Sequence, residues 1–303
     1  LKQLATLNAQ ELSICLLDKG SEVGSHIVSG CVMNPRGLDE LIPNWRELGF
    51  PVTTEVKKDK IVYLTKSKQY KLPLPSDWSN YGNYIISLSQ LCRKLAEYAE
   101  SLGVEIYPGF AAKSALIEDG ILKGILTGDM GLERDGTPSA NYQPGIEIRA
   151  KQTILAEGCR GSVSKQLIEY FKLDADSQPQ TYGLGIKEIW RVDPKKHRLG
   201  NVTHTIGYPL DAQTYGGGFV YHLAGGLVSV GLVTALDYQN PYLSPYEEFQ
   251  RFKLHPNIKR LLKDGERLEY GARTAIEGGL QALPKLCFPG GNIIGESAGF
   301  INV

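Results

Sequence analysis

The sequence predicts a mixed α/β fold in which a parallel, dinucleotide-binding sheet is interleaved with an antiparallel sheet. The segment 84–107 reads as strand, helix and strand, an order typical of a parallel sheet. Strand-like runs between residues 183 and 235 are joined by short polar or glycine turns, which favours an antiparallel meander. The apolar run 12–17 ends in Asp18, the pattern of the second strand of a dinucleotide-binding unit.

The composition is ordinary for a globular protein. Of 303 residues, 42% are hydrophobic and 22% charged, which is enough chain for two compact domains. The formal net charge is zero, so we expect no nucleic-acid partner, and no apolar run approaches the roughly 20 residues of a membrane-spanning helix. The cysteines have no CxxC spacing, which argues against a disulfide framework or a zinc site and favours a reducing compartment. They are Cys15, Cys31, Cys92, Cys159 and Cys287.

The parallel part is expected to contain one clear helix and several short strands. The helix covers 87–102, where apolar residues recur at three- and four-residue spacing, and Gly103 supplies a stop. The expected strands are 12–18, 84–86, 104–107, 152–156 and 292–295.

The antiparallel part is expected to form a sheet that faces the substrate. The sequence Ala224-Gly225-Gly226 suits a hairpin connection, and Ser244 with Pro245 suits the start of a helix over 245–263. The expected strands are 183–192, 201–209, 217–223 and 227–235. Because strands of the first kind return near the end of the sequence, the two domains are interleaved.

Asp18 is a candidate ligand for the ribose hydroxyls of a dinucleotide. The glycine-rich turn that should precede it by about 20 residues is not present. Residues 1–7 instead resemble the end of the helix that follows such a turn. We therefore expect the sequence to be the interior of a larger protein and to bind a dinucleotide weakly by itself. Taken alone, Asp18 is better explained by an ordinary strand-end turn.

Three further segments suit a dinucleotide. Small residues over 24–30, among them Gly24, His26, Ser29 and Gly30, allow backbone N–H groups to approach a planar ring or a pyrophosphate. A flexible surface loop with a structural histidine is the alternative. Glu157, Gly158 and Gly161 precede a helix start near 162, whose N-terminus favours anions. Gly295, Glu296 and Gly299 follow a late strand, where an acid can accept a hydroxyl hydrogen.

Two other segments have possible binding roles. Tyr215, Gly216 and Gly217 open a strand in the meander, where a planar ligand could lie against backbone; a bulged strand start is equally plausible. Residues 57–75 carry six lysines against the single acid Asp59, interleaved with apolar residues. This mixture suits a hairpin on an anionic membrane, with Ile61, Leu64 and Leu74 in the acyl boundary, although a solvated hairpin also explains it.

Long motifs of this sequence resemble those of the electron transfer flavoprotein–ubiquinone oxidoreductase family, and the resemblance covers essentially the whole chain. They are DKG at 18–20, GSHIVSG at 24–30, GNYI at 82–85, GVEIYPGF at 103–110, AEGCRG at 156–161, PQTYGLGIKE at 179–188, TYGG at 214–217, LDYQNPYLSP at 236–245 and FPGG at 288–291. Two departures are Asp18, where glutamate is usual, and Glu296, which is closer to ordinary flavoprotein reductases.

The resemblance implies an FAD-binding Rossmann-like parallel sheet interleaved with an antiparallel-sheet quinone-binding domain. It implies that electrons pass singly from reduced electron transfer flavoprotein to membrane ubiquinone. The family also carries a [4Fe-4S] cluster, which we expect in a C-terminal domain beyond these residues, so no metal ligand is assigned here. The protein would lie peripherally on an inner membrane, on its cytoplasmic face in a bacterium or its matrix face in a mitochondrion.

The resemblance also distributes roles along the chain. Residues 1–60, 81–175 and 271–303 would form the FAD-binding domain, 61–80 a membrane-facing hairpin, and 176–270 the quinone-binding domain. The expected flavin contacts are Asp18, Gly24, His26, Ser29, Gly30, Glu157, Gly158, Gly161, Gly295, Glu296 and Gly299. The expected quinone contacts are Tyr215, Gly216 and Gly217. No general acid or base is assigned. The alternatives are a geranylgeranyl-reductase-like FAD enzyme and a flavin-free binding module.

Overall fold

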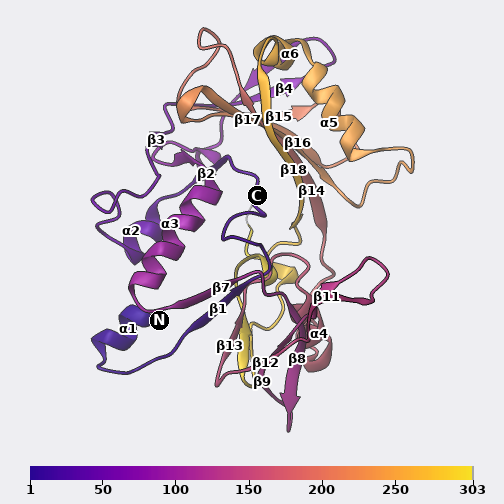
Figure 1. Ribbon diagram of the computed structural model, residues 1–303. Helices are drawn as coiled ribbons and strands as arrows, with labels where there is room; N and C mark the ends of the chain where they lie inside the picture. Colours follow the sequence, from indigo (N-terminus) through magenta and orange to yellow (C-terminus); the bar gives the residue numbers. More distant parts are fainter. Residues whose placement is uncertain (302–303) are drawn as a thin grey trace. The chain divides into compact units, whose positions relative to one another are not determined.

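A computed structural model describes residues 1–301, which divide into two compact units (Figure 1). Unit 1 contains Leu1–Val23, Ala99–Tyr182 and the last segment, from Ala275. Unit 2 contains Gly24–Tyr98 and Gly183–Thr274. The two units therefore alternate along the chain, and each is described by itself below.

Unit 1 contains two small sheets with parallel strand pairs, as the apolar runs predict. After helix α1 (Lys2–Leu7), strand β1 (Cys15–Asp18) pairs in parallel with β7 (Glu105–Pro108). Strand β13 (Thr153–Leu155) pairs in parallel with β20 (Gly291–Ile293), which also pairs antiparallel with β19 (Cys287–Phe288).

An antiparallel sheet in unit 1 has no counterpart among the expected elements. It consists of β8 (Ala112–Glu118), β9 (Ile121–Thr127) and β12 (Glu147–Arg149). A hairpin of β10 (Met130–Leu132) and β11 (Pro138–Gln143) follows β9 in sequence. Helix α4 (Ser162–Phe171) completes the core. That core is formed by Leu122, Ile125, Leu155, Val163, Leu167, Leu173, Ile293 and Ala298.

Unit 2 is built on a sheet of seven strands in the order β18-β14-β17-β16-β15-β4-β5 (Figure 1). The strands are β4 (Lys58–Leu64), β5 (Gln69–Leu72), β14 (Tyr182–Arg191), β15 (Asn201–Gly207), β16 (Gly216–His222), β17 (Leu227–Ala235) and β18 (Glu266–Ile276). Strands β15, β16 and β17 form the expected antiparallel meander. Strand β14 pairs with β17 instead of β15, which gives a Greek-key order, and β4 adds in parallel beyond β15.

Two helices pack on one face of this sheet. The expected helix 245–263 is two helices, α5 (Pro245–Leu254) and α6 (Pro256–Leu262), because a proline at 256 lacks an N–H and interrupts the helix. The expected cap is confirmed, since Ser244 Oγ accepts the N–H of Glu247. Phe249 and Phe252 of α5 join the core that β14–β17 provide.

A three-stranded antiparallel sheet completes unit 2. Its order is β2 (Cys31–Met33), β6 (Tyr84–Ile86) and β3 (Thr54–Glu55), with helix α2 (Arg36–Leu41) after β2. Helix α3 (Leu88–Ser101) follows β6 close to the expected bounds. The expectation that strand 84–86 belongs to a parallel sheet is wrong, because its two edges are taken by β2 and β3.

Four short 3-10 turns connect these elements: Ser76–Trp78, Ala224–Gly226, Leu280–Ala282 and Gly295–Ser297. The second of these joins β16 to β17 at the expected hairpin. Among the helices of residues 1–301, none has both the length and the apolar character needed to cross a bilayer.

Candidate functional site

Asp18 ends β1, and its carboxylate closes the turn that follows. Its Oδ1 accepts the N–H of Gly20 at 2.8 Å, and the side chain is half-buried. This hydrogen bond is the one that a strand-end turn requires. The role of Asp18 as a ribose ligand therefore remains a prediction.

Glu157 caps helix α4 with its side chain. Oε2 accepts the N–H of Ser164 at 2.7 Å and its hydroxyl at 2.6 Å, and Oε1 accepts the N–H of Val163 at 3.3 Å. The protein's own carboxylate thus occupies the position at the helix N-terminus that would attract an anion. Gly161 permits this cap, because a Cβ there would lie 2.5 Å from Glu157 Oε2.

Glu296 is held on one side only. Its Oε1 accepts the N–H of Ile276 at 2.6 Å, while Oε2 is buried and has no hydrogen-bond partner within residues 1–301. Burial raises the pKa of this carboxyl more than the Ile276 N–H lowers it. An unpartnered buried acceptor is suited to a ligand hydroxyl, which is the contact that the sequence predicts for this acid.

The structure brings the second and third predicted flavin segments of unit 1 together. Ser297 Oγ donates to the carbonyl of Gly158 at 3.1 Å. A cavity of about 780 Å³ is bordered by Gly158, Gly161 and Ser297, and also by Gln180, whose Oε1 is buried without a partner within residues 1–301. Gly158 has φ +83° and open space at its Cβ position, so the chain there can approach a ligand. These residues fit a bound FAD.

The predicted loop 24–30 belongs to unit 2, and its end is packed. The Ser29 hydroxyl lies 2.6 Å from the hydroxyls of both Ser87 and Ser89. Gly30 (φ +94°) approaches β17 so closely that a Cβ would lie 2.6 Å from the Ser229 side chain. These contacts hold the end of the loop in place against its neighbours.

The start of the loop is more open. The side chain of His26 is exposed, and its carbonyl accepts a hydrogen bond from Arg273. Gly24 has φ +82°, and a Cβ there would lie 2.9 Å from the carbonyl oxygen of Ser89. The first half of the loop is therefore anchored through its backbone, and its side chains are free to face a ligand.

The glycine run at the start of β16 is close to its own sheet. A Cβ at Gly216 would lie 2.3 Å from the carbonyl oxygen of Val233, and one at Gly217 would lie 2.5 Å from that of Thr205. Tyr215, just before the strand, is 65% exposed. Sheet geometry alone therefore requires both glycines, and their contact with a quinone remains a prediction.

The two faces of the sheet differ at this point. Gly218 packs on α5, because a Cβ there would lie 2.5 Å from the Phe252 ring. Side chains alternate along a strand, so Gly217, Phe219 and Tyr221 lie on the opposite face. A ligand over Gly217 would occupy the face away from the helices.

Partly buried titratable groups lie on that face, and none of them is among the predicted site residues. Tyr221 OH and His204 Nε2 are 2.8 Å apart, and the Phe219 ring stacks on Tyr221 at 4.7 Å. Burial raises the pKa of Tyr221 and lowers that of His204, the latter against the influence of Asp59. Burial also lowers the pKa of Lys187, whose Nζ donates to the Gly30 carbonyl at 3.4 Å. Strand alternation in β15 and β16 was the available signal.

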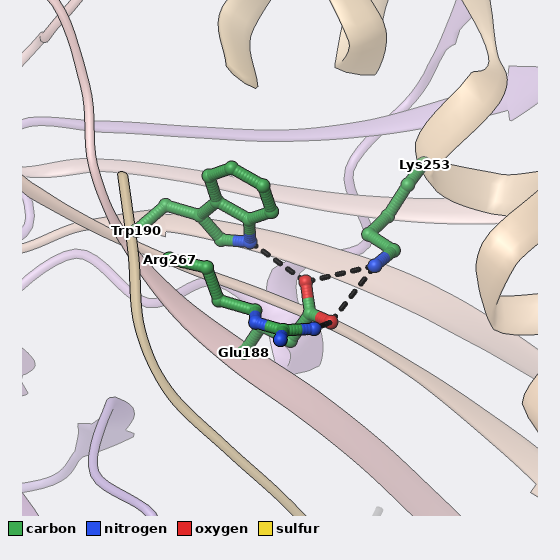
Figure 2. Close-up of polar contacts among 4 residues, drawn as sticks. All are labelled: Glu188, Trp190, Lys253 and Arg267. Atoms are coloured by element: carbon green, nitrogen blue, oxygen red, sulfur yellow. Dashed lines mark hydrogen bonds and ion pairs between the residues drawn. The ribbon is translucent and has the colours of Figure 1, made fainter. Parts of the chain in front are cut away.

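The helix-covered face carries a different polar cluster (Figure 2). The Glu188 carboxylate, 4% exposed, accepts two hydrogen bonds from Lys253 Nζ at 2.8 and 2.9 Å. Trp190 Nε1 donates to it at 2.7 Å and Arg267 at 3.4 Å. Because the charges and donors satisfy one another, this cluster attaches α5 to β14 and leaves no group for a ligand.

The basic segment 57–75 forms the hairpin β4–β5, but two of its expected membrane contacts are wrong. Ile61 is 3% exposed and Leu64 is 1% exposed, because β4 pairs with β15 and both side chains belong to the core. Tyr63 and Tyr70 face each other across the hairpin and are 44% and 52% exposed. Leu74 is partly buried.

Comparisons with known proteins agree with this architecture. A family model described as "ETF-QO, ubiquinone-binding" matches residues 182–275, which run from β14 through β18. The chain is 53% identical to the mitochondrial electron transfer flavoprotein–ubiquinone oxidoreductase of Dictyostelium discoideum, over 100% of this chain and 50% of that protein. It is 54% identical to the Pseudomonas aeruginosa protein of the same description, over 100% of this chain and 56% of that protein.

Solved structures show the same fold at low identity. A geranylgeranyl bacteriochlorophyll reductase-like protein from Thermoplasma acidophilum has a TM-score of 0.69 at 16% identity, over 96% of this chain and 66% of that one. A flavoprotein/dehydrogenase from Cytophaga hutchinsonii has a TM-score of 0.63 at 15% identity, over 99% and 69%. The chain thus has the mixed α/β fold of FAD-dependent oxidoreductases, and its residues 182–275 match the ubiquinone-binding family model.

The sequence identities are more specific than the fold. Over its whole length the chain is homologous to the electron transfer flavoprotein–ubiquinone oxidoreductase family of enzymes, as its motifs predict. The chain spans about half the length of the curated relatives it matches.

Proposed function

We propose that the protein transfers electrons from a reduced flavoprotein, through bound FAD, to ubiquinone at a membrane surface. The observation that carries this proposal is the match of the ubiquinone-binding family model to β14–β18, the sheet that contains Gly216 and Gly217. The named relatives are all described as acting between electron transfer flavoprotein and ubiquinone. That flavoprotein is accordingly the proposed electron donor.

The proposed FAD contacts are those that the sequence predicts. In unit 1 they are Asp18, Gly158, Glu296 and Gly299, where the unpartnered Oε2 of Glu296 would accept a ribityl hydroxyl. Glu157 and Gly161 would act indirectly, by fixing the start of α4. In unit 2 the loop 24–30 would offer backbone N–H groups. A bound flavin supplies the one-electron chemistry, and the protein positions it and excludes water.

The quinone would lie on the helix-free face of the unit 2 sheet, over Gly217 and beside Tyr215. Exposed tyrosines rather than Ile61 and Leu64 would insert at the membrane interface, together with the lysines of the hairpin β4–β5. We propose that the protein lies peripherally on the inner membrane, in a bacterium or a mitochondrion.

The [4Fe-4S] cluster of the family is not assigned to any residue of this chain. Within residues 1–301, no group of three or more His, Cys, Asp or Glu side chains could hold a metal ion. From the resemblance to the family alone, we propose that the cluster lies in sequence outside these residues.

Two alternative functions have less support. A geranylgeranyl-reductase-like enzyme shares the fold, but the identity is 16% there against 53% and 54% for the quinone oxidoreductases. A flavin-free binding module would leave Glu296 Oε2 and Gln180 Oε1 without partners.

The test uses the full open reading frame that contains these residues. The purified protein should show flavin absorbance and should reduce ubiquinone when reduced electron transfer flavoprotein is supplied. A protein without flavin would support the binding module. A flavoprotein that reduces an isoprenoid double bond and leaves ubiquinone unchanged would support the alternative enzyme.

A further inference from the structure

We propose that His204 and Tyr221 form a proton relay that serves the quinone over Gly217. The inference rests on the proposed function and adds to it the group that delivers a proton. Reduction of a quinone to a quinol takes two electrons and two protons, and each carbonyl oxygen becomes a hydroxyl. The electrons come from the reduced flavoprotein donor, so the chain must still supply or admit the protons.

The pair lies on the quinone face, close to the predicted site. His204 is directly opposite Phe219 in the β15–β16 register, and Phe219 is the next residue after Gly217 on that face. Ile206, two residues from His204, has its Cγ2 3.8 Å from the Cβ position of Gly217. His204 and Ile206, the residue beside Gly217, are therefore separated by one two-residue repeat of the strand, about 6.8 Å. An imidazole and one water can span that distance.

The hydrogen bonding of His204 suits a relay. Its Nε2 lies 2.8 Å from Tyr221 OH, whereas Nδ1 makes no hydrogen bond within the described residues 1–301. The ring can therefore give a proton from Nδ1 to the quinone oxygen and recover one at Nε2 from the Tyr221 hydroxyl, and a flip of the ring then restores the donor beside the quinone. Burial keeps the pKa of His204 below its ordinary value, so the imidazole is neutral at pH 7 and can do both.

Charged and titratable groups surround the pair from each neighbouring element. Asp59 of β4 influences both His204 and Tyr221, and it has one buried oxygen, Oδ1, without a partner within residues 1–301. Its other oxygen accepts from Asn80, a residue in a partly exposed turn. Cys31 of β2 lies near Tyr221, and Lys187 of β14 near Cys31. Asp59 and its turn thus provide a polar path by which solvent restores the Tyr221 proton.

The relay supplies one of the two protons, and water at the other carbonyl oxygen supplies the second. A purely structural role is the competing explanation, because a buried tyrosine hydroxyl needs a partner. The two explanations differ in what they predict for an acceptor that takes electrons without protons. Ferricyanide is such an acceptor.

The experiment compares ubiquinone and ferricyanide reduction by the flavin-loaded product of the full open reading frame. In Tyr221→Phe and His204→Ala, the ratio of the ubiquinone rate to the ferricyanide rate should fall about a hundredfold, the low end of what a positioned proton donor contributes. The ratio should fall further as pH rises, because protons then come from bulk water. Added imidazole should restore it in His204→Ala.

Tyr246→Phe is the matched control, since it removes the same atom from an exposed side chain on α5. A ratio that is unchanged in both relay variants, with normal ubiquinone reduction by the parent, overturns the relay alone. Equal losses with both acceptors also overturn it, in favour of a structural role. A parent protein that reduces ferricyanide and not ubiquinone overturns the proposed function as well.

Discussion

Lys253 and Glu188 form a buried ion pair that joins α5 to β14, with Nζ and Oε1 2.8 Å apart and side chains 13% and 4% exposed. The ammonium also lies 4.8 Å from the centre of the Phe249 ring. Removal of Lys253 leaves the buried Glu188 carboxylate with only the half-exposed Arg267 as a charged partner, at 3.4 Å, which is costly.

We expect Lys253→Met to lower the free energy of unfolding by about 3 kcal/mol. The matched control is Glu266→Gln, which breaks the exposed pair with Arg191, where the side chains are 66% and 58% exposed. That change should cost less than about 1 kcal/mol. Urea unfolding measures the free energy of unfolding of both variants. Equal losses would show that the buried pair stabilises the fold no more than the exposed pair.

The carboxyl of Glu296 should make stability depend on pH. Its pKa is raised in the folded state because it is buried, so the fold favours the protonated form. Stability should therefore decline as pH rises from below the ordinary glutamate range through the raised pKa. Glu296→Gln should remove this decline while it keeps the acceptor for the Ile276 N–H. Thermal melting between pH 4 and 8 tests this prediction. If the melting temperatures of the parent and of Glu296→Gln change with pH in parallel, the prediction is wrong.

The predicted quinone site needs a probe that spares the sheet. Replacing Gly217 with valine would force a Cβ to within 2.5 Å of the Thr205 carbonyl oxygen, so it would distort β15 as well as fill the site. Ile206→Trp adds bulk beside Gly217 from a side chain that is 40% exposed. It should raise the KM for ubiquinone at least about tenfold, because the added bulk would weaken binding of the headgroup by ~1.4 kcal/mol.

The control for Ile206→Trp is Leu254→Trp, an exposed position at the end of α5. Ferricyanide reduction should be the same in both variants. An unaltered KM for ubiquinone in Ile206→Trp would place the quinone elsewhere.

The hairpin β4–β5 should bind anionic vesicles through its tip. We expect the triple change of Lys66, Lys68 and Lys71 to Glu to abolish sedimentation with anionic liposomes at low salt, because each lysine near such a surface contributes about 1 kcal/mol. All three side chains are exposed. The control changes Lys151 and Lys195, exposed lysines elsewhere in the chain, to Glu. If the triple variant still sediments with the liposomes, the hairpin does not contact the membrane and is an ordinary solvent-exposed surface.

Local patterns predicted the elements well, but not their partners. Alternation and the glycines at 225 and 226 were sufficient for β16 and β17, and three- and four-residue spacing was sufficient for α3. The place of β14 beside β17 and the pairing of β6 with β2 depend on contacts between distant segments, which no local pattern encodes.

The site shows the same limit. The sequence marked Glu157 as a ligand contact, whereas its carboxylate caps α4 through Ser164, seven positions along the chain. It marked Ile61 as a membrane contact, whereas β4 pairs with β15, a strand that begins at residue 201. The partly buried pair of His204 and Tyr221 depends on strand register, which is fixed only when the sheet forms.

The pairing of β4 with β15 also constrains how the molecule is made. Residue 58 cannot reach its neighbour until residue 201 has left the ribosome, so the hairpin β4–β5 must wait as an unpaired edge while the chain grows. Lysines on such an edge discourage other nascent chains from adding to it, since like charges would be brought together. The basic character of this hairpin can thus serve the protein before any membrane is encountered.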